Sequence, residues 1–421
     1  MNNMAEKKNL PEIRFKGFKE EWEKKDFIDI VDKRDGIRRG PFGSSIKKDM
    51  FVPKSDYVVY EQQNAIYDRY ETRYNITKEK YDELIKFKID AGDYIMSGAG
   101  TIGRISRVPN GIKKGVFNQA LIRIKLNSEV IDSEYFLQWM RSDDMQHRLT
   151  EANPASAMVN LVPMAEVKKW NIHKPKIVEQ SQIGTYFKHL DHLITLHQSK
   201  YDMLVNVKKV MLEKMFPKKG EDVPEIRFKG FTGAWEKRKL GEMTDYKNGK
   251  GHEDRQVAAG KYELINLNSI SIDGGLKLSG KFIDETDTTL KINDLVMVLS
   301  DVAHGNLLGR VALIPENDRF VLNQRIALLR SNQSQSINPI FLLYNINAHQ
   351  NYFKSQGAGM SQLNISKNSV ENFTLLVPSL VEEQSKIGTF FKHLDHLLAL
   401  QQQELEKLKN IKKACLEKMF V

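Results

Sequence analysis

The chain has 421 residues, 41% hydrophobic and 28% charged, a globular balance that excludes wholesale disorder and fits two or three domains. It has no run of about 20 apolar residues and no apolar core near its start, so we expect no membrane-spanning segment, no secretory signal and a cytoplasmic location. A net charge of +10 suits a nucleic-acid partner, because phosphates attract Lys and Arg.

The first predicted domain spans residues 1–175 and combines strands, glycine-rich turns and short helices. It opens on the segment Pro11–Phe18, with the sequence PEIRFKGF, and Trp22 follows. Apolar residues alternate over Leu121–Leu126, a pattern that predicts a half-buried strand. We expect a short helix over Tyr135–Arg141.

A long helix follows in the predicted spacer of residues 176–217. Within Gln180–Phe216, apolar residues recur at alternating spacings of four and three over five heptads, which is typical of a coiled-coil seam. Pro175 lies just upstream and Pro217 closes the helix, because proline interrupts helical hydrogen bonding. At a rise of about 1.5 Å per residue, such a helix is roughly 55 Å long.

The second predicted domain, residues 218–378, begins like the first. Pro224–Phe231 repeats PEIRFKGF unchanged, and Trp235 follows at the same offset. Most of the remaining domain resembles the first only faintly. Asp294–Leu299 predicts a buried strand, and Ile340–Ile346 predicts a short helix.

The second spacer helix, in residues 379–421, is a near-copy of the first. Gln384–Phe420 aligns without a gap on Gln180–Phe216, with identical residues at 23 of the 37 positions. Near-identical helices between diverged domains indicate one shared task for the helices and different tasks for the domains. The predicted helix-helix interface consists of Ile183, Phe187, Leu190, Ile194, Leu204, Met211, Ile387, Phe391, Leu394, Leu398, Leu408 and Cys415.

Polar residues interrupt this seam at matching heights in the two copies. His197 corresponds to Gln401, and Lys208 corresponds to Lys412. Because polar residues in a coiled-coil seam restrict which alignments are stable, we interpret these positions as controls on helix register.

A His-x-x-His pattern occurs at His189–His192 and again at His393–His396. Residues three apart share a helix face, and two histidines can contribute to a metal site. The sequence shows no third ligand beyond the aspartate inside each pattern. The single cysteine, Cys415, also excludes a multi-thiolate site and an intramolecular disulfide. We therefore predict no metal site, and favour helix packing or a subunit contact for these histidines.

Several short motifs recur in the same order in both halves of the chain. They are Glu179-Gln180 with Ile183, Glu383-Gln384 with Ile387, the run from Gly92-Asp93 to Gly103-Arg104, and the pairs Asn118-Gln119 and Asn323-Gln324. The second domain departs from the pattern, because Asn293 replaces the glycine and five extra residues lie between Asp294 and Arg310. With this duplicated order, the chain resembles the specificity subunit of a Type I DNA restriction-modification complex.

The resemblance implies an α+β fold, with two mixed α/β target-recognition domains separated by two long antiparallel coiled-coil helices and a pseudo-twofold internal repeat. It implies a DNA-binding, non-catalytic subunit in which each domain reads one half of a bipartite target in double-stranded DNA. Two modification subunits would bind this chain and methylate adenine with S-adenosylmethionine. Restriction subunits would translocate and cut unmodified DNA with ATP and Mg²⁺. The chain itself is expected to bind no cofactor and no membrane.

Loop residues of certain types are candidate base readers, because Arg can grip guanine, and Asn or Gln can grip adenine, through two hydrogen bonds. The candidates are Ser97, Thr101, Arg104, Asn118 and Gln119 in the first domain, and His304, Asn306, Arg310, Asn323, Gln324 and Arg325 in the second. Phosphate contacts, or turns that fix strand ends, are the alternatives for each. The structural alternative is stronger for the Asn-Gln pairs, because residues that read different half-sites should differ.

Two basic loops, Gly36–Lys48 and Lys247–Arg255, mix glycine and lysine without apolar periodicity, so we expect them to be exposed. A solvated surface without a ligand is one interpretation and phosphate binding is the other. The phosphate-binding candidates are Arg38, Arg39, Lys47, Lys48, Lys247 and Lys250.

Two other functions are alternatives to the one that the resemblance implies. In a single-chain DNA methyltransferase, Asn338–Phe341 would correspond to the Asn-Pro-Pro-aromatic loop, but the second proline is missing and no Gly-x-Gly cofactor signature precedes it. We predict no catalytic residues. A coiled-coil scaffold that does not bind DNA leaves the duplicated but diverged domains unexplained.

Overall fold

The computed structural model describes residues 10–151, 163–286, 288–302 and 305–421. The chain divides into two compact units: unit 1 is Met1–His197 with Glu404–Val421, and unit 2 is Gln198–Gln403. The division falls within the two long helices, so each unit contains one domain and part of each helix. In the described ranges, no helix is long and apolar enough to cross a membrane.

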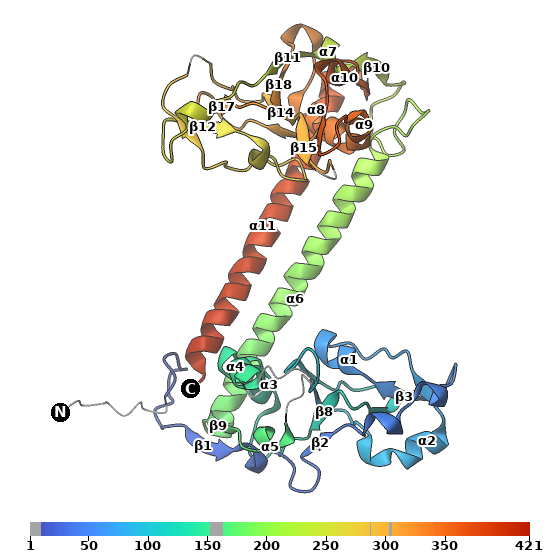
Figure 1. Cartoon of the computed structure of the whole chain (residues 1–421), viewed down its shortest axis with the longest axis vertical. Coiled ribbons are helices and arrows are strands. Elements are labelled where there is room, and N and C mark those ends of the chain that lie inside the picture. Colours follow the sequence, from blue (N-terminus) through green and yellow to red (C-terminus); the bar gives the residue numbers. More distant parts are fainter. Residues whose placement is uncertain (1–9, 152–162, 287, 303–304) are drawn as a thin grey trace, which may run out of the picture. The chain divides into compact units, whose positions relative to one another are not determined.

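The first domain is built on a four-stranded antiparallel sheet in the order β2-β8-β5-β6 (Figure 1). A three-stranded sheet, β4-β3-β7, contains one parallel pair, and β1 pairs with β9 where the chain enters and leaves the domain. The strands are β1 (Glu23–Asp26), β2 (Ile37–Arg39), β3 (Tyr57–Tyr60), β4 (Asn75–Ile76), β5 (Tyr94–Ser97), β6 (Ile105–Arg107), β7 (Lys114–Phe117), β8 (Leu121–Ile124) and β9 (Asn171–Lys174).

The four-stranded sheet lies between two other layers. Because strand side chains alternate between faces, Met96 and Ile122 pack with Phe136 of α3, whereas Ile95 and Leu121 pack with the three-stranded sheet. The sheet is thus buried on both faces, by two separate hydrophobic clusters. Its helices are α1 (Gln62–Tyr67), α2 (Lys78–Glu83), α3 (Ser133–Arg141), α4 (Asp143–Glu151) and α5 (Met164–Val167).

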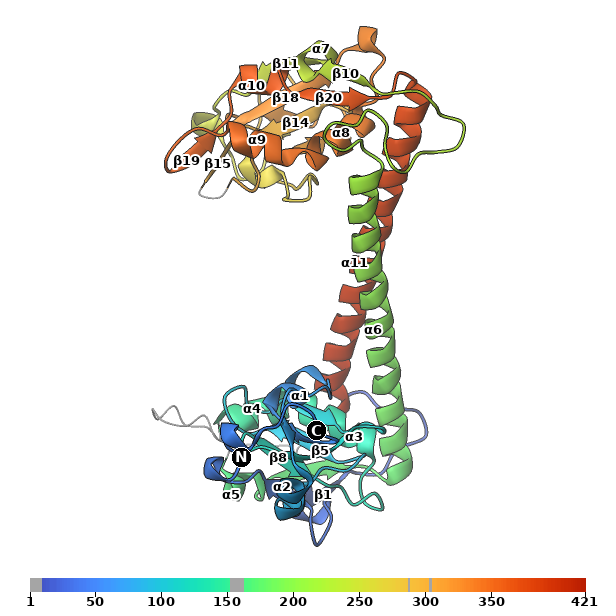
Figure 2. The same ribbon diagram turned by 90° about the vertical axis from the view of Figure 1, so that its right-hand side faces the viewer.

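The second domain repeats this topology, with sheets β11-β18-β14-β16, β13-β12-β17 and β10-β20 (Figure 2). Its strands are β10 (Glu236–Lys239), β11 (Thr244–Asn248), β12 (Tyr262–Ile265), β13 (Phe282–Ile283), β14 (Leu295–Val298), β15 (Ser300–Val302), β16 (Val311–Leu313), β17 (Phe320–Leu322), β18 (Ile326–Ser331), β19 (Gln362–Asn364) and β20 (Thr374–Val377). Its helices are α7 (Leu240–Met243), α8 (Pro339–Ala348), α9 (Gln350–Gln356) and α10 (Lys367–Glu371).

The departures of the second domain from the motif pattern have a local structural basis. Asn293 has φ +69°, in the same left-handed region as Gly92 at +90°, and asparagine tolerates this conformation better than most residues. The stretch with the five extra residues contains β15, which pairs with β19 in a small sheet that has no counterpart among the described strands of the first domain. The insertion therefore extends the loop and leaves the four-stranded sheet intact.

The predicted short helices are confirmed as α3 and α8, and the predicted buried strand is confirmed as β14. The strand predicted over Leu121–Leu126 is confirmed as β8, but its expected half-burial is wrong, since all four residues of β8 are buried. The alternation of apolar and polar residues is misleading because the charged residue Arg123 is itself buried. It is 1% exposed, donates to the Lys88 carbonyl at 2.8 Å and pairs with the Asp35 carboxylate.

The expectation that both basic loops are exposed is wrong in part. Ile37–Arg39 forms β2, and Ile37 packs on the core. Thr244–Asn248 forms β11, and His252 is buried. Both strands lie at the edge of their sheet, where Lys and Arg side chains can still reach water.

The two predicted long helices are confirmed as α6 (Ile177–Lys214) and α11 (Val381–Met419), each of which begins three residues before the predicted start. They pack antiparallel within each unit. In unit 1 the rings of Phe187 and Phe420 are 5.9 Å apart, and in unit 2 Phe391 and Phe216 repeat this distance. The predicted interface residues are buried at Ile183, Phe187, Leu190, Ile387, Phe391 and Leu394, and partly buried at Ile194, Leu204, Met211, Leu398, Leu408 and Cys415.

Candidate DNA-binding surface

Each domain is fixed to the long helices by a buried pair from the repeated motifs. The Arg14 guanidinium donates to both carboxylate oxygens of Glu179 at 2.6 and 2.7 Å, a contact that raises the pKa of Arg14. Arg227 donates to Glu383 in the same way at 2.7 and 2.8 Å. Both glutamates are 1% exposed, so these arginines provide the partners that the buried charges require. The PEIRF segments and helix-opening glutamates therefore have an anchoring role.

The neighbouring glutamines anchor a helix of each domain. Gln180 Oε1 accepts a hydrogen bond from the backbone N–H of Asp132 at 2.8 Å, and Gln384 Oε1 accepts one from Asn338 at 2.9 Å. Asp132 and Asn338 are the N-cap residues of α3 and α8, whose first N–H groups bond to their side chains. The tetrapeptide that suggested a methyltransferase loop is thus the capped start of α8, with proline in its first turn.

An aspartate inside the first His-x-x-His pattern links three helices of unit 1. Asp191, on α6, accepts from Gln138 of α3 at 3.0 Å and pairs with Lys412 of α11 at 2.6 Å. The lysine side chain is 17% exposed, which agrees with its predicted place in the seam.

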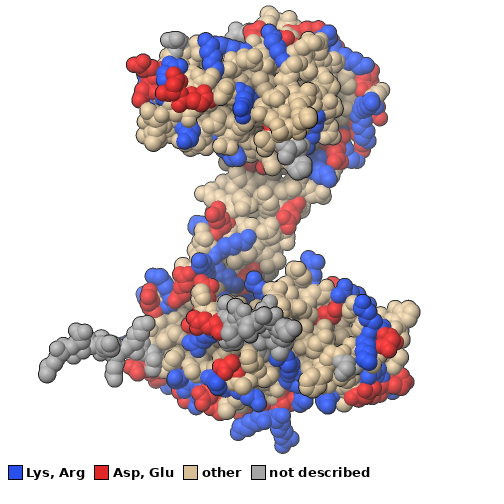
Figure 3. All heavy atoms as spheres, viewed as in Figure 1, with Lys and Arg blue, Asp and Glu red and all other residues tan. Residues whose placement is uncertain are grey.

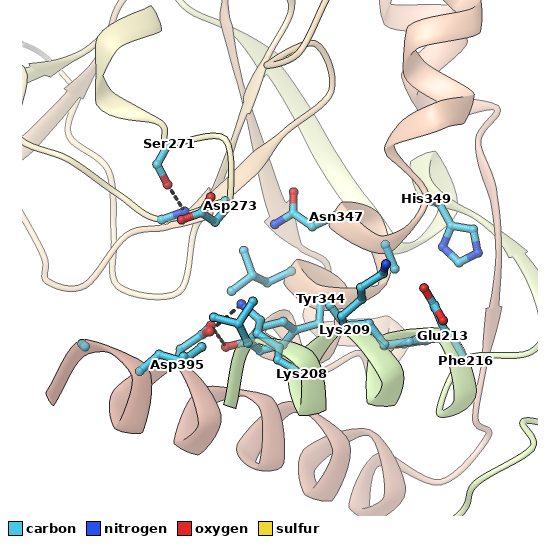
Figure 4. Close-up of a pocket in the computed structure, with 18 of the residues that line it drawn as sticks. Lys208, Lys209, Glu213, Phe216, Ser271, Asp273, Tyr344, Asn347, His349 and Asp395 are labelled. Atoms are coloured by element: carbon cyan, nitrogen blue, oxygen red, sulfur yellow. Dashed lines mark hydrogen bonds and ion pairs between the residues drawn. The ribbon is translucent and has the colours of Figure 1, made fainter. Parts of the chain in front are cut away.

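Unit 2 repeats this arrangement with one substitution (Figure 4). Asp395, on α11, pairs with Lys208 of α6 at 2.5 Å and accepts from the Tyr344 hydroxyl of α8 at 2.7 Å. Burial, the largest cause, raises the pKa of Tyr344, so the hydroxyl keeps its proton and remains a donor. These residues lie in a pocket of about 990 Å³ formed by α6, α8, α11 and the turn Ser271–Gly275. Both lysines thus pair across the two long helices, and their control of helix register stays a prediction.

Three loops of the first domain meet where the strands β2, β5 and β8 of its four-stranded sheet begin or end. Together these loops, residues 39–45, 97–104 and 118–121, are called tip 1. Arg39 Nη2 donates to the carbonyl of Gly98 at 2.9 Å, and the Gly98 N–H donates to Ala120 at 2.8 Å. The fold thus brings together candidate residues that are up to 80 positions apart in the sequence.

The candidates in and beside tip 1 separate into structural and exposed residues. Ser97 is fully buried, and its hydroxyl accepts from the Arg104 N–H at 3.1 Å. Asn118 Oδ1 accepts from the Ala120 N–H at 3.1 Å, and Arg38 pairs with Asp35 at 2.8 Å. Burial lowers the pKa of Arg39, which holds the Gly98 loop. The exposed candidates, whose side chains make no hydrogen bond or ion pair with another described residue, are Thr101, Arg104, Gln119, Lys47 and Lys48.

Tip 2, made of residues 248–255, 298–302 and 323–326, has the same backbone frame. The Gly249 N–H donates to Ile326 at 2.9 Å, as the Gly40 N–H donates to Leu121 at 3.0 Å. A Cβ atom on either glycine would lie 1.8 Å from the carbonyl oxygen of Asn323 or Asn118, so both positions require glycine. The Asn-Gln pairs occupy equivalent turns in the two tips.

The second-domain candidates divide in the same way. The side chain of Gln324 donates a hydrogen bond to Glu253, and Asn306 Oδ1 accepts one from Lys354 at 3.1 Å. Arg310 donates to the Asn347 carbonyl at 2.9 Å, and burial lowers the pKa of Arg310. Asn323 is buried, and His304 lies outside the described residues. The candidates that are exposed and have no side-chain partner among the described residues are Lys247, Lys250 and Arg325.

The sequence interpretation missed two features of the tips. Gln62, at the start of α1, donates to the carbonyl of Ala99 and so supports the glycine-rich loop. Phe42 projects from tip 1 with 89% of its side chain exposed, and its signal was an apolar residue inside a loop of Gly, Pro and Ser. On the face drawn in Figure 3, Lys and Arg lie among Asp and Glu in both units, so net charge alone does not mark a DNA surface.

Comparison with known proteins gives a consistent result over almost the whole chain. The family model of the Type I restriction modification DNA specificity domain matches twice, at residues 19–205 and 233–410. The specificity subunit of the Type I restriction enzyme MjaVIII from Methanocaldococcus jannaschii is 22% identical over 319 residues, which is 72% of each chain. The putative MjaX specificity subunit of the same organism is 22% identical over 348 residues, which is 79% of each chain.

Solved structures show the same fold at lower sequence identity. The Type I restriction-modification S subunit from M. genitalium matches with a TM-score of 0.64 at 15% identity, covering 98% of this chain and 99% of its own. A chain from a study of complex assembly and conformational transition in the type I R-M system has a TM-score of 0.52 at 16% identity, covering 95% and 97%. These matches confirm the α+β fold with its internal repeat. The chain belongs to the family of Type I restriction-modification DNA specificity subunits.

Proposed function

We propose that each domain of this specificity subunit reads one half of a bipartite target in double-stranded DNA through its tip. The observation that carries the proposal is a contrast between two sets of residues. The contacts that fix the domains to the helices are the same in both units, as Arg14–Glu179 and Arg227–Glu383 illustrate. The exposed tip residues differ, with Thr101 and Arg104 in one tip and Lys250 and Arg325 in the other. One scaffold thus presents two different sets of base-reading side chains.

The partners in this proposal are two copies of a modification subunit, together with restriction subunits. Support comes from the solvent-facing positions of the helix repeats. From Thr185 to Leu196 and from Thr389 to Leu400, six of the seven positions exposed in both copies carry identical residues, although none is needed for the buried seam. The six pairs are Thr185 and Thr389, Lys188 and Lys392, His189 and His393, His192 and His396, Leu193 and Leu397, and Leu196 and Leu400.

The next turns of the same helices provide the comparison. At Ser199, Lys200, Asp202, Met203 and Val205 the side chains are exposed, and all five differ from their counterparts in α11. Exposed identity returns further along at Asn206, Lys209 and Glu213, which match Asn410, Lys413 and Glu417. The stripe is thus one of two shared exposed stretches separated by unshared turns, and its two apolar leucines favour a shared binding partner over the solvation of the helices. Two copies of the same exposed stripe are suited to bind two copies of the same partner subunit.

This stripe can be tested by counting subunits. Changing Leu196 to Arg, or Leu400 to Arg in a separate variant, should leave one modification subunit bound in place of two, because a charge opposes burial of an apolar contact. Mass photometry measures the stoichiometry directly, and Met203→Arg in the unshared turns is the control. Retention of two subunits by both leucine variants would contradict the assignment of the stripe.

In this proposal the chain itself is non-catalytic and binds no cofactor. Modification subunits supply S-adenosylmethionine and methylate adenine, and restriction subunits use ATP and Mg²⁺. The contribution of this chain is to hold two base-reading surfaces on one frame, which makes recognition of the two half-sites part of one binding event.

Sequencing of modified bases in a host with and without the gene tests the proposal. The expected result is a single split motif that is methylated only when the gene is present together with its modification subunit. The purified chain alone, incubated with DNA and S-adenosylmethionine, should transfer no methyl group. A continuous motif, or methyl transfer by the chain alone, would contradict the assignment.

A further inference from the structure

Among the described residues, the most exposed Phe, Tyr or Trp lies on tip 1. Phe42 is 89% exposed, whereas every other Phe and Trp in the described ranges is buried or partly buried. Single exposed apolar residues are common on protein surfaces, so exposure alone assigns no role. The local geometry around Phe42 supports a functional role for this residue.

The loop that presents Phe42 is fixed by the backbone on both sides. Before it, Gly40 packs directly on the turn at Asn118, where a Cβ atom would lie 1.8 Å from the carbonyl oxygen. After it, the Ser45 N–H donates to the Phe42 carbonyl at 2.8 Å, and Pro41 is buried. The chain thus holds an apolar side chain in solvent on a constrained loop, which reduces the entropy lost when a ligand covers it.

Groups suited to DNA lie on tip 1 and on the residues that directly follow its first loop. Gln119 comes within 3.7 Å of the Cβ position of Gly43, the residue that follows Phe42. Arg104 and Gln119 are exposed, and Lys47 and Lys48 extend from the same loop without an ion-pair partner among the described residues. The loops around Phe42 therefore present side chains that can contact bases and phosphates.

We propose that Phe42 makes an apolar contact with a base in the half-site read by the first domain, an inference that rests on the proposed function. Phenylalanine can pack on the methyl group of thymine or wedge into a base step, and both modes bury the ring against a base. In tip 2 the residue at the same distance from the equivalent glycine is Gly251, two positions after Gly249. The aromatic contact therefore belongs to the first half-site alone.

The test uses the complex with modification subunits, on the target identified by sequencing of modified bases. Phe42→Ala should weaken binding to the full target about tenfold, the range expected for loss of an aromatic-base contact, and Phe42→Leu should restore part of it. Discrimination against changes in the second half-site should stay as in the wild type. Ile28→Ala, an exposed apolar residue away from the tip, is the control and should bind like the wild type.

Two DNA probes distinguish the modes of contact. Replacing each thymine of the first half-site by uracil removes the methyl group, and 2-aminopurine fluorescence reports unstacking of a base. One of the two signals should depend on Phe42. Unchanged affinity and half-site selectivity in Phe42→Ala would overturn the inference, as would loss of the modification subunits from that variant, which would indicate a protein contact. A wild-type complex that selects no bipartite target would instead contradict the proposed function.

Discussion

The two ends of each domain have diverged to different degrees. At the long helices, Glu179 and Glu383 accept the same pair of hydrogen bonds from the arginine of a repeated PEIRF segment. At the tips, Phe42 follows Gly40 by two positions, whereas Gly251 follows the equivalent Gly249 by two. A buried charge allows few substitutions, because an unpaired carboxylate is costly, whereas an exposed loop side chain is free to vary. The protein thus keeps its frame constant and varies the surface that the frame presents.

The largest expected effect comes from breaking the constant end. Arg14→Ala leaves the buried Glu179 without its partner and should lower the free energy of unfolding by about 3–5 kcal/mol. Arg227→Ala should give at least an equal loss, because Arg227 also donates to the carbonyls of Gly233 and Thr232. Hydrogen exchange should place each loss in the unit that carries the substitution.

Lys176→Ala provides the control, since its pair with Glu20 is exposed and should contribute at most about 1 kcal/mol. Denaturant unfolding compares the three variants. If one arginine variant were as stable as the control, the two anchors would not be equivalent.

Substitutions in the tips should change the DNA sequence specificity. Arg104→Ala should relax selection at one position of the first half-site, by about 1–3 kcal/mol, and Arg325→Ala should do the same in the second, because each removes one candidate base contact. Competition binding with single base changes measures both effects.

The lysines that directly follow the first loop of tip 1 should act differently. Replacing Lys47 and Lys48 by Ala should weaken binding to all sequences alike and reduce the salt dependence by about two released ions. A loss of selectivity in the lysine variant, or a uniform loss in Arg104→Ala, would reverse the assigned roles.

A smaller effect is expected in the helix seam, where the units resemble each other without being identical. Lys412→Met leaves Asp191 with Gln138 and with Arg141 at 3.9 Å, and Lys208→Met leaves Asp395 with Tyr344. Because these pairs are partly exposed, each variant should lose about 1 kcal/mol of stability, measured by thermal unfolding. The neighbouring Lys413→Met, on an exposed position, should change little. A gain in stability for either seam variant would show that packing outweighs the ion pair.

Sequence analysis predicted the repeat, both long helices and the buried strand β14, because each depends on a periodic pattern that local residues determine. It misassigned the burial of β8, because the polar residue Arg123 is buried by contacts with Asp35 and Lys88, which are distant in the sequence. For the candidate site, the sequence predicted which types of residue it contains but not which of them are exposed. Ser97 and Arg310 are of the right residue type for DNA contact, but they bond to the protein itself, and only the fold shows which side chains remain exposed.

The central claim is that each domain is an independent reader on a common frame, and duplication of one domain tests it most directly. Residues 19–176 are replaced by residues 232–380 of the same chain, so that both domains become the second while both helices are kept. Because the anchors recur in both units, the variant should fold, assemble with modification subunits and methylate a split target whose two halves form an inverted repeat, the same sequence on opposite strands. Sequencing of modified bases provides the measurement. Methylation of the original target, or of a motif in which the second half-site is also changed, would contradict the account.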